Sequence, residues 1–442
     1  MGEVAQRENW SGRFGALMAM TGMAVGLGNI WRFPYMVGTY GGGAFVFAYL
    51  VCCIIIVMPL AIMEAGLGKN AQAGEVDVWS EILHNKKAGG VVGGFFAFGY
   101  ASMNFFYMFV IATIVYYMYV FVSGLTDKVE DTQVIYDTMN NDMTGVMIAL
   151  TVVVTLIMIA LIYLGIVKGV EAACKVMVPA IAIIFIVIAV LEIFMVPNIV
   201  EGYNYYLNPD WSVLGQFDLW KAALGQALFS VGVGPGCMLV YGSHIAKDED
   251  AVLSIITVCV LDTAIALVAG FAIIPACVAL GMEPQSGSGL IFIVLPKILT
   301  LIPAGKIIGL FIMIAMFFAA LSSALAQLEV AVTSYADGFN WGRKKSVLIC
   351  GVITLIMAIV CVVNKAQFDF WNNFAGNYVF IVTAGLGAIG YAYIYGVKRI
   401  KEEALDIGAD IKLGNWFIPL VKFIAVPLMV IIMADSLFPF LG

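Results

Sequence analysis

The stretch M-A-V-G-L-G-N-I-W-R-F-P-Y, residues 23–35, decides how this fold is interpreted. It lies in an apolar segment near the N-terminus, yet it contains two glycines, an asparagine, an arginine and a proline. A helix interrupted in the bilayer core leaves backbone N–H and C=O groups without partners, at several kcal/mol each. Such an interruption is tolerated where a substrate or ion binds the freed groups.

The composition of the chain is that of a polytopic membrane protein. Of its 442 residues 62% are hydrophobic and 12% are charged, whereas soluble domains carry about 25% charged residues. No basic run extends beyond Arg343-Lys344-Lys345, so no nucleic-acid partner is predicted. Eight cysteines without a C-x-x-C pair and only two histidines predict neither a metal centre nor an intramembrane enzyme.

A membrane-spanning helix needs about 20 apolar residues. Segments of this kind recur eleven times, at residues 12–36, 42–69, 90–123, 143–164, 169–196, 218–245, 251–280, 305–338, 344–363, 370–398 and 414–440. Lys and Arg in the short flanks gather mostly on the side of the N-terminus, which the positive-inside rule makes cytoplasmic. An odd number of spans then puts the C-terminus outside. No linker composition is visible, so residues 1–442 are expected to form one transporter domain.

A second glycine-rich stretch interrupts the sixth segment. It reads F-S-V-G-V-G-P-G, residues 229–236, and its segment starts five segments after the first. Paired interruptions in two halves of a chain indicate a transport site between inverted repeats. The alternative is that these glycines only allow close helix packing.

Two facing interruptions predict a site for a zwitterion with small cations. Free N–H groups at a half-helix start attract an anion, and free carbonyls at a half-helix end attract a cation. An amino acid with sodium fits this chemistry. Polar residues within the spans support it, and the lone carboxylate Asp262 is the sharpest because a buried acid is costly. Asp262 could instead be a structural acid, and Ser322-Ser323 could bond their own helix.

Several motifs now resemble one family. A-V-G-L-G-N-I-W-R-F-P-Y (24–35), G-G-G-A-F (41–45), R-E-N-W (7–10), G-I-V-K-G-V-E (165–171), G-Q-A-L-F-S (225–230) and A-A-L-S-S (319–323) are similar to neurotransmitter:sodium symporters, most of all to the bacterial eleven-helix tyrosine transporter type. The resemblance implies an all-α polytopic fold of the LeuT type in the bacterial inner (plasma) membrane. Inverted five-helix repeats are expected at 12–196 and 218–398, with helices 1 and 6 unwound mid-membrane and an extra helix at 414–440.

The resemblance also implies two Na⁺ sites built from oxygen donors, as a hard cation requires. The first would use Ala24, Asn29, Ser230 and Asp262. The second would use Gly22, Val25, Ala319, Ser322 and Ser323.

The amino-acid substrate is expected to bind between these ions. By resemblance its site comprises Met23, Ala24, Gly26, Leu27, Gly28, Thr113, Tyr117, Phe229, Ser230, Gly232, Pro235, Ser323 and Gln327. The outer gate would comprise Arg32, Tyr117, Phe229 and Asp369. The inner gate would comprise Arg7, Trp10 and Asp337. Spacing leaves either Asp369 or Asn372 as the outer-gate partner.

The chain departs from the family at the anion site. Animal members bind chloride near positions that correspond to Tyr49, Gln226, Ser230 and Ala266. Ala266 cannot coordinate chloride through its side chain, whereas Asp262, one turn earlier, can supply the negative charge. We therefore expect chloride-independent transport. A group that protonates when sodium and substrate leave could also export H⁺.

Substrate identity is read from the expected pocket. Gly232 and Pro235 replace larger residues, and Gln327 could hydrogen-bond a phenol, which favours an aromatic amino acid and tyrosine first. A broad neutral amino-acid symporter and a non-transporting amino-acid sensor on the same fold remain the alternatives. The intact Ser322-Ser323 pair favours transport over sensing. The sequence leaves the oligomeric state open.

Overall fold

The computed structural model describes residues 8–129, 131–234, 236–281, 290–301 and 303–438. Arg7 and Pro235, which the sequence assigns to the inner gate and the substrate pocket, lie outside the described residues. Within those ranges the chain is helical and contains no strand. The all-α membrane fold predicted from composition is therefore confirmed.

Among the described residues, nine helical stretches are long and apolar enough to cross a membrane unaided. Five of them are single α-helices: α6 (Lys86–Ser123), α8 (Thr144–Tyr163), α13 (Ala251–Ala279), α15 (Gly305–Gly338) and α16 (Arg343–Val363). The 38-residue α6 is the longest single helix.

The other four long stretches include short π-helical turns. They comprise α3 (Gly43–Cys52), η2 (Cys53–Val57) and α4 (Met58–Ala71); η4 (Ile166–Glu171) and α9 (Ala172–Met195); α17 (Lys365–Asn373), η7 (Phe374–Val379), α18 (Phe380–Ile389), η8 (Gly390–Gly396), α19 (Val397–Ile400) and η9 (Lys401–Leu405); and α20 (Phe417–Leu420), η10 (Val421–Ala425) and α21 (Val426–Leu437).

The two remaining hydrophobic segments are broken, as the glycine clusters predict. The first consists of α1 (Arg13–Ala24), η1 (Gly28–Arg32) and α2 (Phe33–Thr39), and the chain bends by 52° at its break. The sixth consists of α11 (Phe217–Val231) and α12 (Cys237–Gly242), each too short to span alone. Helices thus lie in all eleven expected segments, and among the described residues nine of them, or ten with the bent first pair, are long and apolar enough to span.

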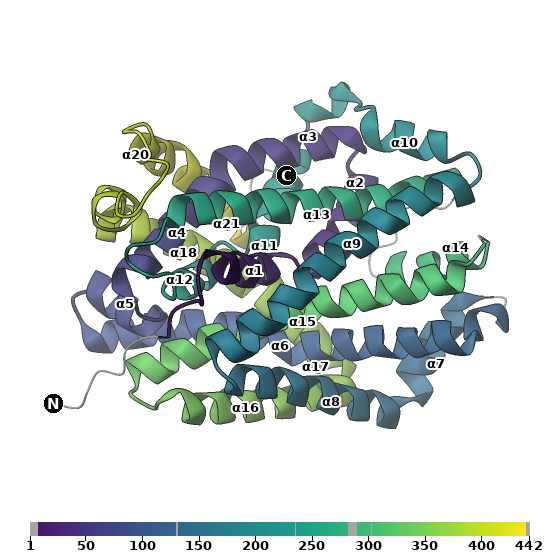
Figure 1. Ribbon diagram of the computed structural model, residues 1–442, viewed down its shortest axis with the longest axis horizontal. Helices are drawn as coiled ribbons and strands as arrows, with labels where there is room; N and C mark the ends of the chain where they lie inside the picture. The colour runs from purple at the N-terminus through teal and green to yellow at the C-terminus, as the bar shows by residue number, and fades with distance from the viewer. Residues whose placement is uncertain (1–7, 130, 235, 282–289, 302, 439–442) are drawn as a thin grey trace.

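The connecting helices lie at opposite ends of the bundle (Figure 1). At one end are α7 (Thr132–Asp142), α10 (Ile199–Leu207) and α14 (Leu295–Thr300). At the other are α5 (Glu75–Ile82), α12 and the N-terminus. Short turns complete the chain: η3 (Leu125–Asp127), η5 (Trp211–Gly215) and η6 (Leu290–Val294).

The broken helix α1 lies in the middle of the bundle, between α13 and α15 (Figure 1). Small residues allow α12 to approach its neighbour α4 closely: a Cβ on Gly68 would lie 1.9 Å from the Leu239 carbonyl oxygen, and one on Gly242 2.5 Å from that of Ala65. Outer helices instead expose large apolar side chains such as Phe194 of α9, as lipid contact requires. The fold thus places both breaks centrally, away from lipid.

Candidate functional site

The first break opens directly after α1. Val25 leaves the helix with φ −71° and ψ 106°, and the backbone resumes a helical path only near Leu27. The Asn29 side chain folds back over this gap, where its Oδ1 accepts a hydrogen bond from the Gly26 N–H at 3.0 Å. One freed donor is thereby satisfied, while the break remains open to bind other groups.

The second break depends on glycine geometry. Gly232, Gly234 and Gly236 have φ values of 73°, 111° and 85°, which residues with a Cβ rarely adopt. The buried carboxylate of Glu64, from α4, accepts hydrogen bonds from the N–H groups of Gly234 (2.8 Å) and Leu239 (3.4 Å). A fixed carboxylate therefore caps the start of α12. The sequence contained this signal, a lone acid in an apolar run, but it was assigned no role.

A buried polar cluster joins the first break to α11 and α13. Asn29 Nδ2 donates to Asp262 Oδ1 at 2.7 Å and to Ser230 Oγ at 3.0 Å, and Ser230 Oγ donates to Asp262 Oδ2 at 2.8 Å. All three residues are at most 1% exposed. These are three of the four residues expected at the first cation site, and Ala24 borders the adjacent cavity.

A second oxygen cluster lies between α1 and α15. Ser322 Oγ donates to the Ala319 carbonyl at 3.0 Å and approaches the Val25 carbonyl at 3.4 Å. Ser323 Oγ lies 3.5 Å from the Met23 carbonyl. The structure thus gathers Val25, Ala319 and Ser322 as expected. Gly22, on the last turn of α1, packs against Cys174 of α9.

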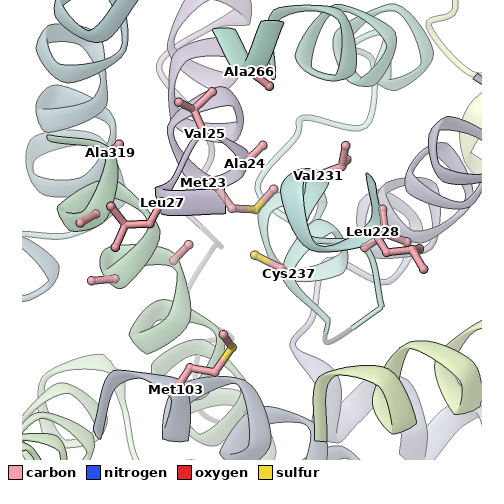
Figure 2. Close-up of a cluster of buried hydrophobic side chains, with 14 of the residues drawn as sticks. Met23, Ala24, Val25, Leu27, Met103, Leu228, Val231, Cys237, Ala266 and Ala319 are labelled. Carbon is pink, nitrogen blue, oxygen red and sulfur yellow. The ribbon is translucent and has the colours of Figure 1, made fainter. Parts of the chain in front are cut away.

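A small cavity of about 30 Å³ lies between the two breaks. Figure 2 shows the end of α1 and the break that follows it, from Met23 to Leu27, between Ala319 of α15 and the region of Val231 and Cys237, with Met103 of α6 below. Nine of the expected substrate residues line this cavity: Met23, Ala24, Gly26, Leu27, Gly28, Phe229, Gly232, Ser323 and Gln327. Four further residues line it that the sequence reading missed: Tyr100, Met103, Tyr107 and Phe380.

Comparisons with known proteins lead to the same kind of protein as the two broken helices around a buried polar centre. The sequence profile of the sodium:neurotransmitter symporter family matches residues 7–142 and 133–440. This chain belongs to the sodium:neurotransmitter symporter family. It is accordingly a transporter and not an enzyme.

Individual relatives are similar to this symporter over nearly its whole length. The chain is 30% identical to an uncharacterized sodium-dependent transporter of Methanocaldococcus jannaschii, over 93% of this chain and 87% of that protein. It is 28% identical to one from Haemophilus influenzae, over 98% and 99%. The crystal structure of MhsT in complex with L-phenylalanine superposes with a TM-score of 0.85, at 29% identity, over 97% of this chain and 100% of MhsT. The fold is therefore of the LeuT type.

The symporter's geometry corrects two expected substrate contacts. Tyr117 packs against Phe292 at 5.0 Å between ring centroids and does not line the inner cavity, and Thr113 lines the outer vestibule. Tyr107 is the tyrosine at the site, since its hydroxyl lies against the Leu27 backbone and the Ser323 hydroxyl. Ten residues along a helix correspond to about 15 Å. Tyr107 is close to the middle of α6, where a mid-membrane site requires it, whereas Tyr117 is near the end.

An outer vestibule of about 420 Å³ leads to the inner cavity of the symporter. Phe229 lines both spaces, with its ring 5.5 Å from Phe380 and 5.4 Å from the Arg32 guanidinium carbon. Arg32 Nη1 donates to Gln226 Oε1 at 3.0 Å. Asn372 lines the vestibule, whereas Asp369 is exposed and does not. The structure therefore places Asn372, and not Asp369, at the vestibule wall.

At the expected chloride positions, the structure shows the Gln226 amide occupied and the Tyr49 hydroxyl without a hydrogen-bond partner among the described residues. Gln226 Nε2 donates to the Gly28 carbonyl at 2.8 Å while its oxygen accepts from Arg32, so both ends of its amide are engaged. Tyr49 and Ala266 are fully buried, and Ala266 offers only a methyl group. The one negative charge that this region supplies among the described residues is that of Asp262.

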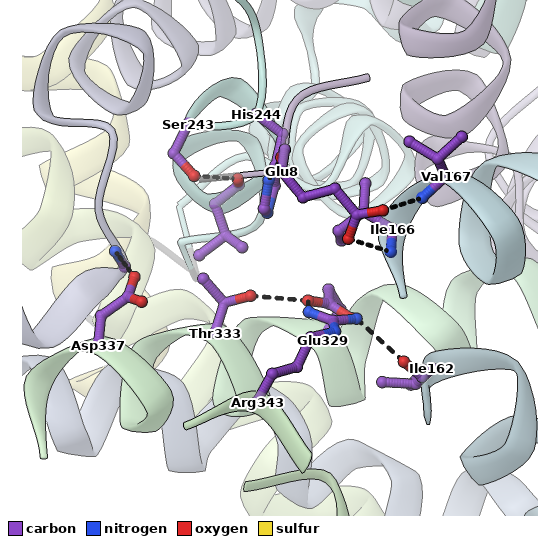
Figure 3. A network of polar contacts seen from close by, with 12 residues as sticks. Glu8, Ile162, Ile166, Val167, Ser243, His244, Glu329, Thr333, Asp337 and Arg343 are labelled. Atoms are coloured by element: carbon purple, nitrogen blue, oxygen red, sulfur yellow. Dashed lines mark hydrogen bonds and ion pairs between the residues drawn. The ribbon is translucent and has the colours of Figure 1, made fainter. Parts of the chain in front are cut away.

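The opposite end of the symporter is closed by the N-terminal segment. Trp10 is buried, and its Nε1 donates to the Tyr241 carbonyl at 3.1 Å. Glu8 accepts hydrogen bonds from the N–H groups of Ile166 (3.0 Å) and Val167 (3.2 Å) (Figure 3).

A second group of contacts at this end involves residues of α15 (Figure 3). Asp337 Oδ2 accepts from the Gly74 N–H at 3.1 Å. Glu329 pairs with Arg343 at 2.6 Å, and Arg343 also donates to the Ile162 carbonyl at 3.1 Å. The site therefore communicates with the vestibule side while the side of Trp10 is sealed.

Proposed function

We propose that this protein carries a neutral, aromatic L-amino acid, tyrosine first, into the cell together with Na⁺ and without a chloride requirement. The observation that carries the proposal is the buried Asp262 carboxylate beside the first break, held only by the neutral groups of Asn29 and Ser230. Uncompensated charges are strongly disfavoured in a membrane interior. A bound sodium ion would neutralise this carboxylate.

Two sodium sites follow from the two oxygen clusters. At the first, the Asn29 amide would turn its oxygen toward the ion beside Asp262, Ser230 and the Ala24 carbonyl. At the second, the carbonyls of Gly22, Val25 and Ala319 would act with the hydroxyls of Ser322 and Ser323. All of these donors are hard oxygens, which suits Na⁺.

The substrate carboxylate would lie at the start of η1, against the N–H groups of Leu27 and Gly28 and the Tyr107 hydroxyl. This arrangement pairs an anion with a half-helix start. MhsT in complex with L-phenylalanine supports an aromatic side chain in the same cavity. The present 30 Å³ cavity does not admit an aromatic ring, so Phe229 must turn toward the vestibule when substrate enters.

Alternating access would couple the two ions to the substrate. Sodium and substrate would enter from the vestibule, Phe229 and Arg32 would close over them, and the seal around Trp10 and Asp337 would then open. The N-terminus would face the cytoplasm and the C-terminus the outside of a bacterial inner membrane. One charge moving down 100 mV supplies about 2.3 kcal/mol, so inward sodium can drive accumulation.

The two breaks would occupy equivalent positions of two inverted repeats. We assign residues 12–196 to the first repeat, residues 218–398 to the second and residues 414–440 to a helix outside both. The arrangement of α1 with α2 and of α11 with α12 supports this division, since each pair is interrupted near its middle.

Sodium-gradient uptake in proteoliposomes tests the proposal. Labelled tyrosine, phenylalanine, tryptophan, leucine and glycine would each be offered with inward Na⁺ and, as a control, inward K⁺. We expect sodium-dependent accumulation that is greatest for the aromatic amino acids. Equal uptake of all five would indicate a broad neutral symporter, and sodium-dependent binding without accumulation would indicate a sensor.

A further inference from the structure

One polar atom in the inner cavity has no partner. Gln327, on α15, is 3% exposed, and its Oε1 makes no hydrogen bond in the described structure. The residue lines the cavity together with Met23, Met103 and Gly232. A buried polar atom without a partner is costly, and its place in the cavity wall indicates that a ligand completes it.

Gln327 lies away from the end where the substrate backbone would bind. Ser323, one helical turn earlier on α15, contacts Tyr107 at that end. Asn104 Nδ2 donates to the Ala324 carbonyl at 3.1 Å and the Tyr335 hydroxyl donates to the Gly94 carbonyl at 3.0 Å, so α6 and α15 run in opposite directions. Gln327 is therefore about 6 Å further along the cavity than Ser323, toward the level of Tyr100.

Gly232 lines the same cavity as Gln327 and adds no side chain to its wall. A Cβ on Gly232 would make only ordinary contacts, at 4.0 Å from the Cys237 Sγ and from the Tyr100 hydroxyl. Once Phe229 has turned toward the vestibule, a ring whose backbone end sits near Leu27 would extend past Gly232. Its far end would then meet the amide of Gln327 among otherwise apolar walls.

We propose that Gln327 selects substrates whose side chain ends in a hydrogen-bond donor. This inference rests on the proposed transport function and deepens it by naming the group that is recognised. A tyrosine hydroxyl would donate to Gln327 Oε1. Bound phenylalanine has no such donor, so it would bury that oxygen without a hydrogen bond. Leaving such a group unpaired costs roughly tenfold to a hundredfold in affinity.

A ligand series on the wild-type protein separates hydrogen bonding from size. Competition against labelled L-tyrosine in sodium buffer would use L-phenylalanine, 4-amino-L-phenylalanine and 4-methoxy-L-phenylalanine. We expect the 4-amino compound to bind within a few-fold of tyrosine. The 4-methoxy compound, which has no donor, should bind at least roughly tenfold more weakly. Equal binding of tyrosine, phenylalanine and the 4-methoxy compound would overturn the inference.

The variant Gln327→Met tests the residue itself, because methionine has a similar length without an amide. Tyrosine affinity should fall roughly tenfold to a hundredfold while phenylalanine affinity is kept or improves. The matched control is Asn104→Leu, a buried amide at the same helix contact whose Oδ1 also lacks a partner but which does not line the cavity. The control should leave the tyrosine-to-phenylalanine ratio unchanged.

The outcomes distinguish this inference from the proposed function. If wild-type protein takes up phenylalanine with sodium but shows no preference for tyrosine, the inference fails and the symport function stands. If no amino acid is taken up with sodium, the proposed function itself fails. Equal loss of both ligands in Gln327→Met would show that the amide only supports the fold. If that variant does not fold, the wild-type ligand series still decides.

Discussion

The two helix breaks satisfy their backbone in different ways. At the first, the side chain of Asn29 covers the Gly26 N–H, and the Tyr107 hydroxyl lies against the Leu27 backbone. At the second, three glycines with positive φ turn the chain, and the Glu64 carboxylate accepts from the N–H groups of Gly234 and Leu239. The first break is thus covered by neutral side chains that a ligand can displace, whereas the second is capped by a buried acidic side chain of the protein itself.

The surroundings of the breaks differ in the same sense. A Cβ on Gly26 or Gly28 would meet the ends of side chains, Ser323 Oγ and the Phe229 ring, which can move. A Cβ on Gly234 would lie 2.2 Å from the Cβ and 2.3 Å from the Cα of Ala384, atoms that cannot move without the backbone. The comparison indicates that the first break responds to ions and substrate while the second provides a fixed wall.

The largest effect on transport is expected at Asp262, which lies beside the first break. Asp262→Ala removes the charge that we assign to sodium binding, so sodium-driven uptake should fall by roughly a hundredfold or more, the scale of losing a paired buried charge. Because the carboxylate accepts hydrogen bonds from Asn29 and Ser230 but has no cationic partner in the sodium-free protein, the stability without sodium should fall by no more than about 1–3 kcal/mol. A larger fall, measured as a drop in melting temperature, would show that Asp262 is a structural acid.

A smaller effect on stability is expected at Glu64, which belongs to the fixed break. Glu64→Gln places an amide NH₂ where two backbone N–H groups need an acceptor, which should cost about 1–3 kcal/mol of stability. The melting temperature should drop by a similar amount with and without sodium. If sodium restored the stability of this variant, the second break would also be ligand-responsive.

The smallest effect concerns Glu75, which lies beside the second break outside the spanning segments. Burial, together with the neighbouring Glu64 carboxylate, raises the pKa of Glu75 from 4.5 to about 8. The Tyr391 hydroxyl lies 3.2 and 3.1 Å from its two oxygens. The folded state therefore keeps a proton that the unfolded chain loses, so stability falls as pH rises from 4.5 to 8, by at most about 1.4 kcal/mol per pH unit.

Glu75→Gln removes this titration, because the amide is neutral at every pH. Melting temperatures measured between pH 5.5 and 8 should decline less steeply for the variant than for the wild type. Parallel curves for the two proteins would contradict a neutral Glu75 beside Glu64.

The sequence predicted most of the responsive break. The glycines, Asn29, Ser230 and Asp262 were found because unusual residues in apolar runs stand out, and the structure brings them together. Glu64 carries the same signal as Asp262 but was overlooked, since its partners lie in another helix about 170 positions away.

Register along a uniform helix was harder to predict. The 38-residue α6 contains tyrosines at 100, 107, 116, 117 and 119 on an apolar background. Periodicity alone does not say which one lies at the depth of the breaks, and the resemblance points to Tyr117 where the structure places Tyr107 at the cavity. Likewise Asp369 and Asn372 lie three residues apart, and only packing shows that Asn372 faces the vestibule.

The central claim is that Asp262 supplies a built-in negative charge for sodium-coupled uptake. The most direct test is aromatic amino-acid uptake into proteoliposomes under an inward Na⁺ gradient, with all chloride replaced by gluconate. We predict that uptake is retained in gluconate and lost when K⁺ replaces Na⁺. Uptake abolished by chloride removal, or unaffected by sodium removal, would contradict the account.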